Sequence, residues 1–221
     1  GEPIAQTARR QARSASRLNH PNILTVFDIG THSGAPYIVT ELLPGATLQE
    51  LLARGPLPLE KVLVYAQQLA SGLEAAHESG IIHRDIKPAN LAITADGALK
   101  ILDFGLAKLA SPTQSQPPSD TVTLTGRGLV LGTAPYMSPA QARLEPVDKR
   151  SDIWAFGLVL WEMLTGKRLF GASSTAEVLH AVLHQEIDFA QLPGNTPPAI
   201  RTLLARCLER DAKRRLRDIG E

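Results

Sequence analysis

His83-Arg84-Asp85-Ile86-Lys87-Pro88-Ala89-Asn90 is the stretch on which the interpretation of this chain depends, together with Asp103-Phe104-Gly105 further along. Asp85 can accept a proton from a hydroxyl, and Lys87 can neutralise a phosphate. The Asn90 amide and the Asp103 carboxylate supply oxygen atoms of the kind that Mg²⁺ prefers. Phosphoryl transfer needs such groups, because its transition state depends on positioning and charge neutralisation more than on covalent chemistry. A surface loop of satisfied polar residues is the alternative, and it leaves their joint occurrence unexplained.

The first stretch resembles the catalytic loop of the protein kinase family, H-R-D-x-K-x-x-N, and the second resembles its D-F-G segment. Lys87 is typical of the serine/threonine branch, and the chain as a whole is most similar to the eukaryotic-like (Hanks-type) kinases of bacteria. The resemblance implies an α+β, protein-kinase-like fold. We therefore expect a mostly helical large lobe and an incomplete small-lobe sheet.

The resemblance also implies a role for each polar residue. Asp85 orients and deprotonates the substrate hydroxyl, and Lys87 stabilises the transferring phosphate of ATP. Asn90 and Asp103 hold Mg²⁺, so Asp103 also contributes to nucleotide binding. Thr133 completes the catalytic group of Asp85, Lys87 and Asn90, because in the family its hydroxyl reaches the catalytic Asp and Lys.

The composition excludes several classes of protein. The 23 Lys and Arg against 22 Asp and Glu give a net charge of +1, so bulk electrostatics favour neither nucleic acid nor an anionic membrane. The one cysteine, Cys207, excludes an internal disulfide framework and suits a reducing cytoplasm. Its place in an apolar helical run favours a buried structural thiol over a nucleophile. No signal peptide and no apolar run of about 18 residues is visible, which predicts a soluble chain.

Residues 1–43 are interpreted as the remnant of the small lobe, and residues 44–221 as the large lobe. Within the small lobe, residues 7–18 predict a helix. Residues 23–30 and 36–41 predict two strands around a glycine turn. In the family picture these elements correspond to the C-helix and to the fourth and fifth strands.

The predicted adenine site combines the strand end Glu41-Leu42-Leu43 with Ala92. The resemblance implies that this strand end is the hinge, which offers the Glu41 carbonyl and the Leu43 amide to adenine. Ala92 lies where the family places a small apolar floor for the same ring. An ordinary strand edge and a plain strand residue are the alternatives, and both stay open.

The large lobe begins with a predicted long helix. Apolar residues recur from Leu59 at helical spacing, and Gly80 ends the pattern. This helix delivers the catalytic loop at its C-terminal end. Residues 91–94 and 99–102 then predict a hairpin that presents Asp103 on its far side.

Residues 106–132 have the position of the activation loop, and a loop of this length without a pattern is usually functional or disordered. Thr121, Thr123 and Thr125 are candidate phosphorylation sites. Arg84 is the reason for considering phosphorylation, because a cation beside the catalytic Asp is a natural partner for a phosphate on this loop. A solvated loop that is never modified is the alternative for each threonine.

Four features further along favour structural interpretations. Asp152 can cap an apolar helix, and in kinases the matching Asp also hydrogen-bonds the catalytic loop, so both roles are expected. Ser174-Thr175-Ala176-Glu177 predicts a capping box. His180 and His184 lie one turn apart without a third ligand, which favours an ordinary helix face over a metal site. The basic run 210–217 predicts a solvated helix end.

Three departures from the family pattern affect the expected activity. No glycine-rich loop and no strand lysine are present ahead of the predicted first helix, and the usual C-helix glutamate is Gln11. Ala140 replaces the glutamate that ends the activation segment, which is expected to leave Arg215 without a partner. Two strands form a marginal sheet, so Ile23 is expected to lack a cover. We therefore expect a fragment of a longer kinase, with weak Mg-ATP binding and little activity.

The sequence thus predicts a serine/threonine protein kinase catalytic domain that transfers the γ-phosphate of ATP to protein Ser or Thr hydroxyls, impaired in this chain. The expected cofactors are ATP and Mg²⁺, the partner is a protein substrate and not nucleic acid, and the location is the cytoplasm. Autophosphorylation or dimerisation stays open for a longer product. A non-catalytic kinase-like (pseudokinase) binding module is the first alternative. A small-molecule phosphotransferase is the second, and the Thr133 segment argues against it.

Overall fold

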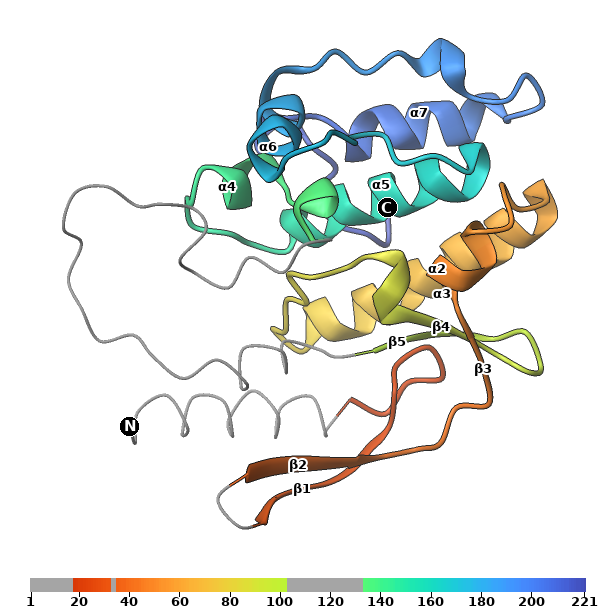
Figure 1. Ribbon diagram of the computed structural model, residues 1–221, viewed down its shortest axis with the longest axis vertical. Coiled ribbons are helices and arrows are strands. Elements are labelled where there is room, and N and C mark those ends of the chain that lie inside the picture. Colours follow the sequence, from red (N-terminus) through yellow and green to blue (C-terminus); the bar gives the residue numbers. More distant parts are fainter. Residues whose placement is uncertain (1–17, 33–34, 103–132) are drawn as a thin grey trace, which may run out of the picture.

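The structure, a computed structural model, describes residues 18–32, 35–102 and 133–221. The β1–β2 hairpin lies at one end of the molecule, the helices α5 to α7 lie at the other, and β3 to β5 lie between them (Figure 1). This arrangement is the predicted α+β architecture. In chain order the elements are β1 (Val26–His32), β2 (Ala35–Thr40), β3 (Gly45–Thr47), α2 (Leu48–Leu52), α3 (Leu59–Glu78), η1 (Pro88–Asn90), β4 (Leu91–Thr94), β5 (Leu99–Ile101), η3 (Ala134–Tyr136), α4 (Pro139–Ala142), α5 (Arg150–Thr165), α6 (Thr175–His184), η4 (Phe189–Gln191) and α7 (Pro198–Cys207).

The two predicted strands of the hairpin are confirmed, but the first begins later than expected. β1 and β2 pair antiparallel. Ile23, predicted to lie in the first strand without a cover, forms a parallel bridge with Ile101 of β5 and is only 2% exposed. That expectation is wrong because this segment runs beside β5, where Ile101 N donates to the Asn22 carbonyl at 2.8 Å. In β1 itself, Phe27 remains 67% exposed.

A three-stranded antiparallel sheet, in the order β3-β4-β5, links the hairpin to the helices. β4 and β5 form the predicted hairpin, and Gly97 adopts a φ of 86° in its turn, a conformation that residues with a Cβ rarely adopt. The η1 turn runs directly into Leu91 of β4, which is fully buried. The sheet therefore fixes the end of the predicted catalytic loop.

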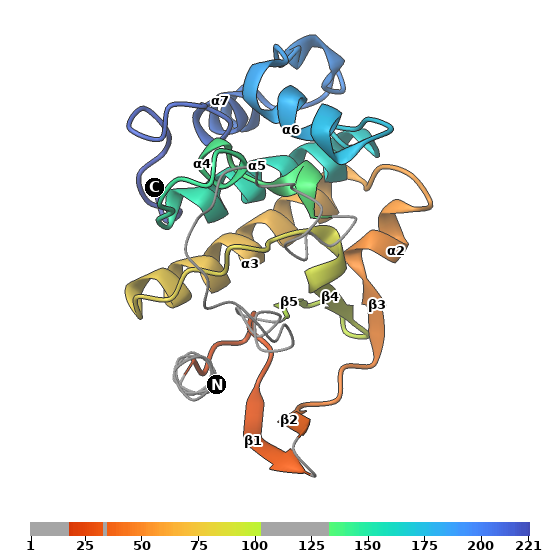
Figure 2. The same ribbon diagram turned by 60° about the vertical axis from the view of Figure 1, so that its left-hand side comes forward.

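Helices α3 and α5 form the centre of the core, between the β4–β5 strands and α7 (Figure 2). α3 coincides with the predicted long helix and ends just before Gly80, whose φ is 72°. α5 is buried from Ser151 to Leu164. Gly157 permits the close approach of α7, because a Cβ there would lie 2.9 Å from the Cβ of Cys207. Cys207 is fully buried, as predicted, and burial raises the pKa of its thiol to about 12.

Helix α6 is held at both ends by side chains. Ser174 caps its start, as predicted, by accepting from Glu177 N at 3.2 Å. The predicted capping box is incomplete, because the Glu177 carboxylate accepts from the Ser173 hydroxyl at 2.8 Å. At the other end, Arg210 Nε donates to the Val182 carbonyl at 2.9 Å. Since α7 ends before this arginine, the prediction of a solvated basic helix end is wrong.

Arg215 also departs from its prediction, because it is 4% exposed and has partners. Its guanidinium lies 5.1 Å from the ring centroid of Trp154. Burial, with the nearby Arg150 guanidinium, lowers its pKa to about 10. Backbone oxygens thus replace the carboxylate that the family would provide. The guanidinium donates to the carbonyls of Glu209, Arg150 and Arg210.

Candidate active site

Asp152 anchors the loop that carries the predicted catalytic residues. It is 1% exposed, and its carboxylate accepts from His83 N at 2.8 Å and from Arg84 N at 2.7 Å. His77 of α3 lies 2.9 Å from the same carboxylate through Nε2. The predicted bond between Asp152 and the loop backbone is therefore confirmed.

The predicted capping role of Asp152 is wrong. Helix α5 begins at Arg150, and its cap residue, Lys149, makes no side-chain cap hydrogen bond. Asp152 lies inside the first turn of this helix, which is buried on all sides. Its carboxylate faces the catalytic loop. The carboxylate accepts hydrogen bonds from the loop amides, whereas a capping side chain would accept them from the first amides of the helix.

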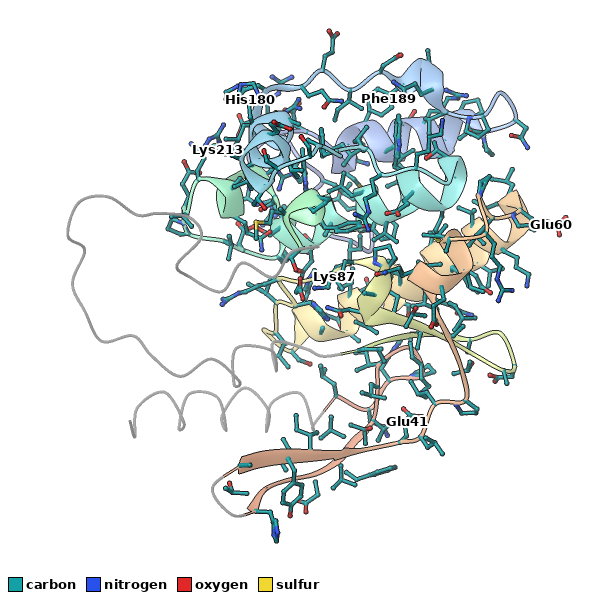
Figure 3. The ribbon with its side chains drawn as sticks, viewed as in Figure 1. Glu41, Glu60, Lys87, His180, Phe189 and Lys213 are labelled. Carbon is teal, nitrogen blue, oxygen red and sulfur yellow. The ribbon has the colours of Figure 1, made fainter. Side chains whose placement is uncertain are left out.

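Asp85, Lys87, Asn90 and Thr133 lie together, as the resemblance implies, but the Thr133 hydroxyl contacts Asp85 only through Lys87. Lys87 Nζ donates to Asp85 Oδ2 at 2.8 Å and to the Thr133 hydroxyl at 2.9 Å. Asn90 Nδ2 donates to the same Asp85 oxygen at 2.9 Å and to the Asp85 carbonyl at 2.8 Å. Lys87 lies in the middle of the molecule, where the loop before β4 faces the segment before α4 (Figure 3). An ammonium and an amide therefore hold one carboxylate oxygen from two sides.

Two side-chain oxygens of this group accept no hydrogen bond among the described residues. Asp85 Oδ1 is buried and has no hydrogen-bond partner among the described residues. Asn90 directs its amide nitrogen at Asp85, so its side-chain carbonyl oxygen is the atom available to a cation. The Asn90 backbone carbonyl accepts from Leu102 N at 2.9 Å, which holds the end of β5 beside the loop.

Several predicted residues lie outside the part of the chain that the structure describes, and the predictions for them stay untested. Within the described part, no three His, Cys, Asp or Glu side chains group as a metal site. His180 and His184 stand with ring centroids 4.8 Å apart and no further ligand in that part. The residues outside it are Gln11, Asp103, Thr121, Thr123, Thr125 and residues 7–17 of the predicted helix.

The predicted adenine residues lie in the segment that follows β2 and on β4. Glu41, at the base of the hairpin (Figure 3), accepts from Lys100 Nζ at 2.8 Å and from Thr25 N at 2.7 Å. Burial alone would raise the pKa of Glu41, but these two donors outweigh it and lower the pKa. Ala92 is 8% exposed on β4, and Leu43 is half-buried. The Glu41 side chain thus ties the predicted hinge to the sheet that carries Ala92.

A cavity of about 540 Å³ adjoins Lys87 and was not predicted from the sequence. Tyr136 and Arg168 form part of its wall. The Tyr136 hydroxyl donates to Glu162 Oε2 at 2.5 Å, and Arg168 Nε lies 3.8 Å from Glu162 Oε1. Burial raises the pKa of Glu162, and the Tyr136 hydroxyl and the Arg168 guanidinium oppose that rise. Burial and the Glu162 charge also raise the pKa of Tyr136.

Two residues that support the loop were missed by sequence reasoning. His77 contacts Asp152 from α3, where a lone histidine on a helix carries no signal. Gln141 donates to the Arg84 carbonyl at 2.8 Å. A signal for Gln141 was available, because Ser138 and Gln141 have the spacing of a capping box, which the structure confirms.

No helix within the described residues is long and apolar enough to cross a bilayer.

The model of the protein kinase domain matches residues 2–217 of the chain.

Three curated relatives are similar to this chain. A probable serine/threonine-protein kinase of Clostridium acetobutylicum is 36% identical over 215 residues, which cover 96% of this chain and 31% of that protein. The serine/threonine-protein kinase PknB of Mycobacterium leprae is 40% identical over 183 residues, 80% of this chain and 28% of that protein. The serine/threonine-protein kinase PrkC of Bacillus subtilis is 38% identical over 205 residues, 92% of this chain and 30% of that protein.

The chain therefore spans about a third of the length of these relatives. The match of residues 2–217 agrees with the hydrogen-bonded group around Asp85. On both grounds the chain belongs to the protein kinase domain family.

Proposed function

We propose that this chain is the catalytic segment of a serine/threonine protein kinase, which transfers the γ-phosphoryl group of ATP to a protein hydroxyl. The observation that carries the proposal is the asymmetry of the Asp85 carboxylate. Oδ2 is held by Lys87 and Asn90, whereas Oδ1 is buried without a partner among the described residues. A buried, unpaired carboxylate oxygen is costly unless a ligand supplies its donor.

A serine or threonine hydroxyl is the donor that fits Asp85 Oδ1. Accepting its hydrogen bond orients the attacking oxygen and takes up the proton as the bond to phosphorus forms. Lys87 places a positive charge beside the same carboxylate, where charge on the transferring phosphoryl group has to be stabilised. Thr133 fixes the ammonium in that place through the 2.9 Å hydrogen bond.

The residues fit a bound Mg-ATP through Asn90 and its surroundings. The Asn90 side-chain oxygen is a suitable ligand for a hard cation, and Asp103 would supply the carboxylate ligand. Leu102, the residue before Asp103, is hydrogen-bonded to Asn90, which favours a common site. When bound, the cation neutralises the phosphate oxygens of the nucleotide. We place adenine against Ala92, with the Glu41 carbonyl and the Leu43 amide as its polar partners.

The cavity beside Lys87 supports a protein substrate. Lys87, whose ammonium is 2.8 Å from Asp85, is among the residues that line it, and it offers about 540 Å³ to a peptide segment. The tightly bonded Tyr136 and Glu162 give this wall a fixed shape. We place the reaction in the cytoplasm, a compartment that suits the unpaired Cys207.

A pseudokinase function is the second candidate, favoured by Gln11 in place of the C-helix glutamate. A neutral amide cannot form the ion pair with the lysine that grips the ATP phosphates. Such a module would keep the fold and bind partners without transferring phosphate. Binding of Mg-ATP and transfer of its γ-phosphate separate the two candidates.

The experiment uses the longest natural gene product that contains this chain, with radiolabelled Mg-ATP and casein as a generic protein substrate. Asp85→Asn keeps the size of the side chain and removes the base, so we expect kcat to fall about 100-fold or more. Asp96→Asn, in the exposed turn between β4 and β5, is the matched control and should leave kcat unchanged. Equal rates for wild type and Asp85→Asn would refute the proposal. Absence of both nucleotide binding and transfer in the wild type would favour the pseudokinase.

A further inference from the structure

Gln141 of α4 reaches in two directions with one side chain. Its Oε1 accepts from Ser138 N at 2.9 Å, and its Nε2 donates to the Arg84 carbonyl at 2.8 Å. The first bond closes the capping box at the start of α4. Because that bond fixes the oxygen, the nitrogen has to point at the catalytic loop.

The carbonyl that receives this bond belongs to a residue in an unfavourable conformation. Arg84 has a φ of 68°, in the left-handed region that side chains with a Cβ rarely adopt. Its N–H donates to Asp152 Oδ1 at 2.7 Å. The backbone of Arg84 is thus held on one side by α5 and on the other side by α4.

The Arg84 carbonyl and the Asp85 N–H belong to the same planar peptide group. The N–H of that group donates to His83 Nδ1 at 3.2 Å, and its oxygen accepts from Gln141. Fixing both ends of one peptide plane sets the direction in which the Asp85 side chain leaves the backbone. Asp152 holds the preceding peptide, so Gln141 acts on a part of the loop that Asp152 does not reach.

We propose that Gln141 is a positioning residue, which holds the Arg84–Asp85 peptide so that the Asp85 carboxylate stays aligned with Lys87 and Asn90. Its effect on phosphoryl transfer rests on the proposed function, whereas its effect on the loop does not. The same segment of chain also contributes Thr133 to Lys87. Docking of residues 133–142 therefore closes two hydrogen bonds on the catalytic loop together.

Gln141→Glu separates this role from a purely structural one. A carboxylate at this position still accepts from Ser138 N and keeps the cap of α4, but it cannot donate to the Arg84 carbonyl. If Gln141 only caps α4, Gln141→Glu should behave as the wild type and Gln141→Ala should be the more damaging change. If it positions the loop, Gln141→Glu should be at least as damaging as Gln141→Ala.

The first measurement is residue-resolved amide hydrogen exchange on the full gene product. We expect exchange at Arg84 and Asp85 to accelerate about tenfold in Gln141→Glu, while the urea midpoint changes little. Gln67→Glu, the same charge change on the exposed face of α3, is the matched control and should leave this exchange at the wild-type rate. Wild-type exchange at Arg84 and Asp85 in Gln141→Glu would overturn the proposal.

The second measurement is steady-state kinetics with Mg-ATP and casein on the same variants. We expect kcat to fall about tenfold in Gln141→Glu with KM for casein within about twofold of wild type. Accelerated exchange with an unchanged kcat would overturn the positioning role. If the wild type transfers no phosphate at all, the proposed function fails, and the exchange experiment still decides whether Gln141 holds the loop.

Discussion

Replacing Asp152 by alanine tests the anchoring of the catalytic loop most directly. The side chain is 1% exposed and accepts from two loop amides, those of His83 and Arg84, and from His77. Alanine removes the acceptor without adding a group that could replace it. The buried His83 amide and the partly buried Arg84 amide then lose this acceptor.

The structure allows the cost of this change to be estimated. Each buried donor left unsatisfied costs about 1–3 kcal/mol, so the two amides together cost about 2–6 kcal/mol. In the variant, Arg84 is free to leave its left-handed conformation, and the relief of this strain reduces the loss of stability by about 1–2 kcal/mol. From the middle of each range, about 4 and about 1.5 kcal/mol, the expected loss in free energy of unfolding is about 2.5 kcal/mol. Asp152→Asn, which keeps one acceptor oxygen, should lose less than the alanine variant.

Urea denaturation monitored by tryptophan fluorescence measures this loss, because Trp154 and Trp161 lie in the core at 0% and 2% exposure. Amide exchange at His83 and Arg84 should accelerate in parallel. Glu60→Ala is the control, since Glu60 points away from the body of the molecule on α3 (Figure 3). A loss below about 1 kcal/mol in Asp152→Ala, with loop exchange unchanged, would refute the anchoring role.

Three further predictions concern the predicted hinge, the thiol and the buried arginine. The Glu41–Lys100 ion pair lowers the pKa of Glu41 in the folded protein. The pair therefore stabilises the fold fully above pH 4.5, the ordinary pKa of the carboxyl group, and this stabilisation is lost as the pH falls through the lower pKa of the folded state. Amide exchange in β1 and β2 should therefore rise at acid pH in wild type, and in Glu41→Gln it should be high and independent of this titration. Cys207, with its raised pKa and full burial, should resist iodoacetamide at neutral pH until urea unfolds the chain, and early alkylation would contradict its placement. Arg215→Met should lower the free energy of unfolding by about 3 kcal/mol, because it leaves buried carbonyls unpaired, whereas Arg214→Met, at a side chain 75% exposed, should change it little in the same urea titration.

The parts of the fold that the sequence predicted are those with a local signal. The helix from Leu59 follows from its apolar spacing, and the β4–β5 hairpin follows from its glycine turn. The contact of Lys87 with Thr133 links residues far apart in the chain, and only the resemblance to a family made it predictable. Periodicity alone contains no information about that pair.

The parts that failed depend on tertiary partners without a sequence pattern. Arg215 was expected to lack a partner because its carboxylate is absent, but backbone carbonyls bind a guanidinium as well, and every residue carries one. Ile23 was expected to be uncovered because the count of strands was small, yet a single bridge to β5 buries it. Asp152 was assigned a cap because the apolar run begins beside it, whereas the helix already begins at Arg150, with Lys149 as its cap residue.

The catalytic and nucleotide halves of the proposed site are supported by different elements. The loop that carries Asp85 is held from the helices, by His77, Asp152 and Gln141. The predicted hinge is held from the sheet, through the ion pair of Glu41 with a lysine of β5. Loss of that pair should loosen the hairpin and leave the catalytic loop in place, whereas loss of Asp152 should release the loop from its anchor. The alignment of the catalytic group is therefore expected to persist whether or not the hairpin is held against a nucleotide.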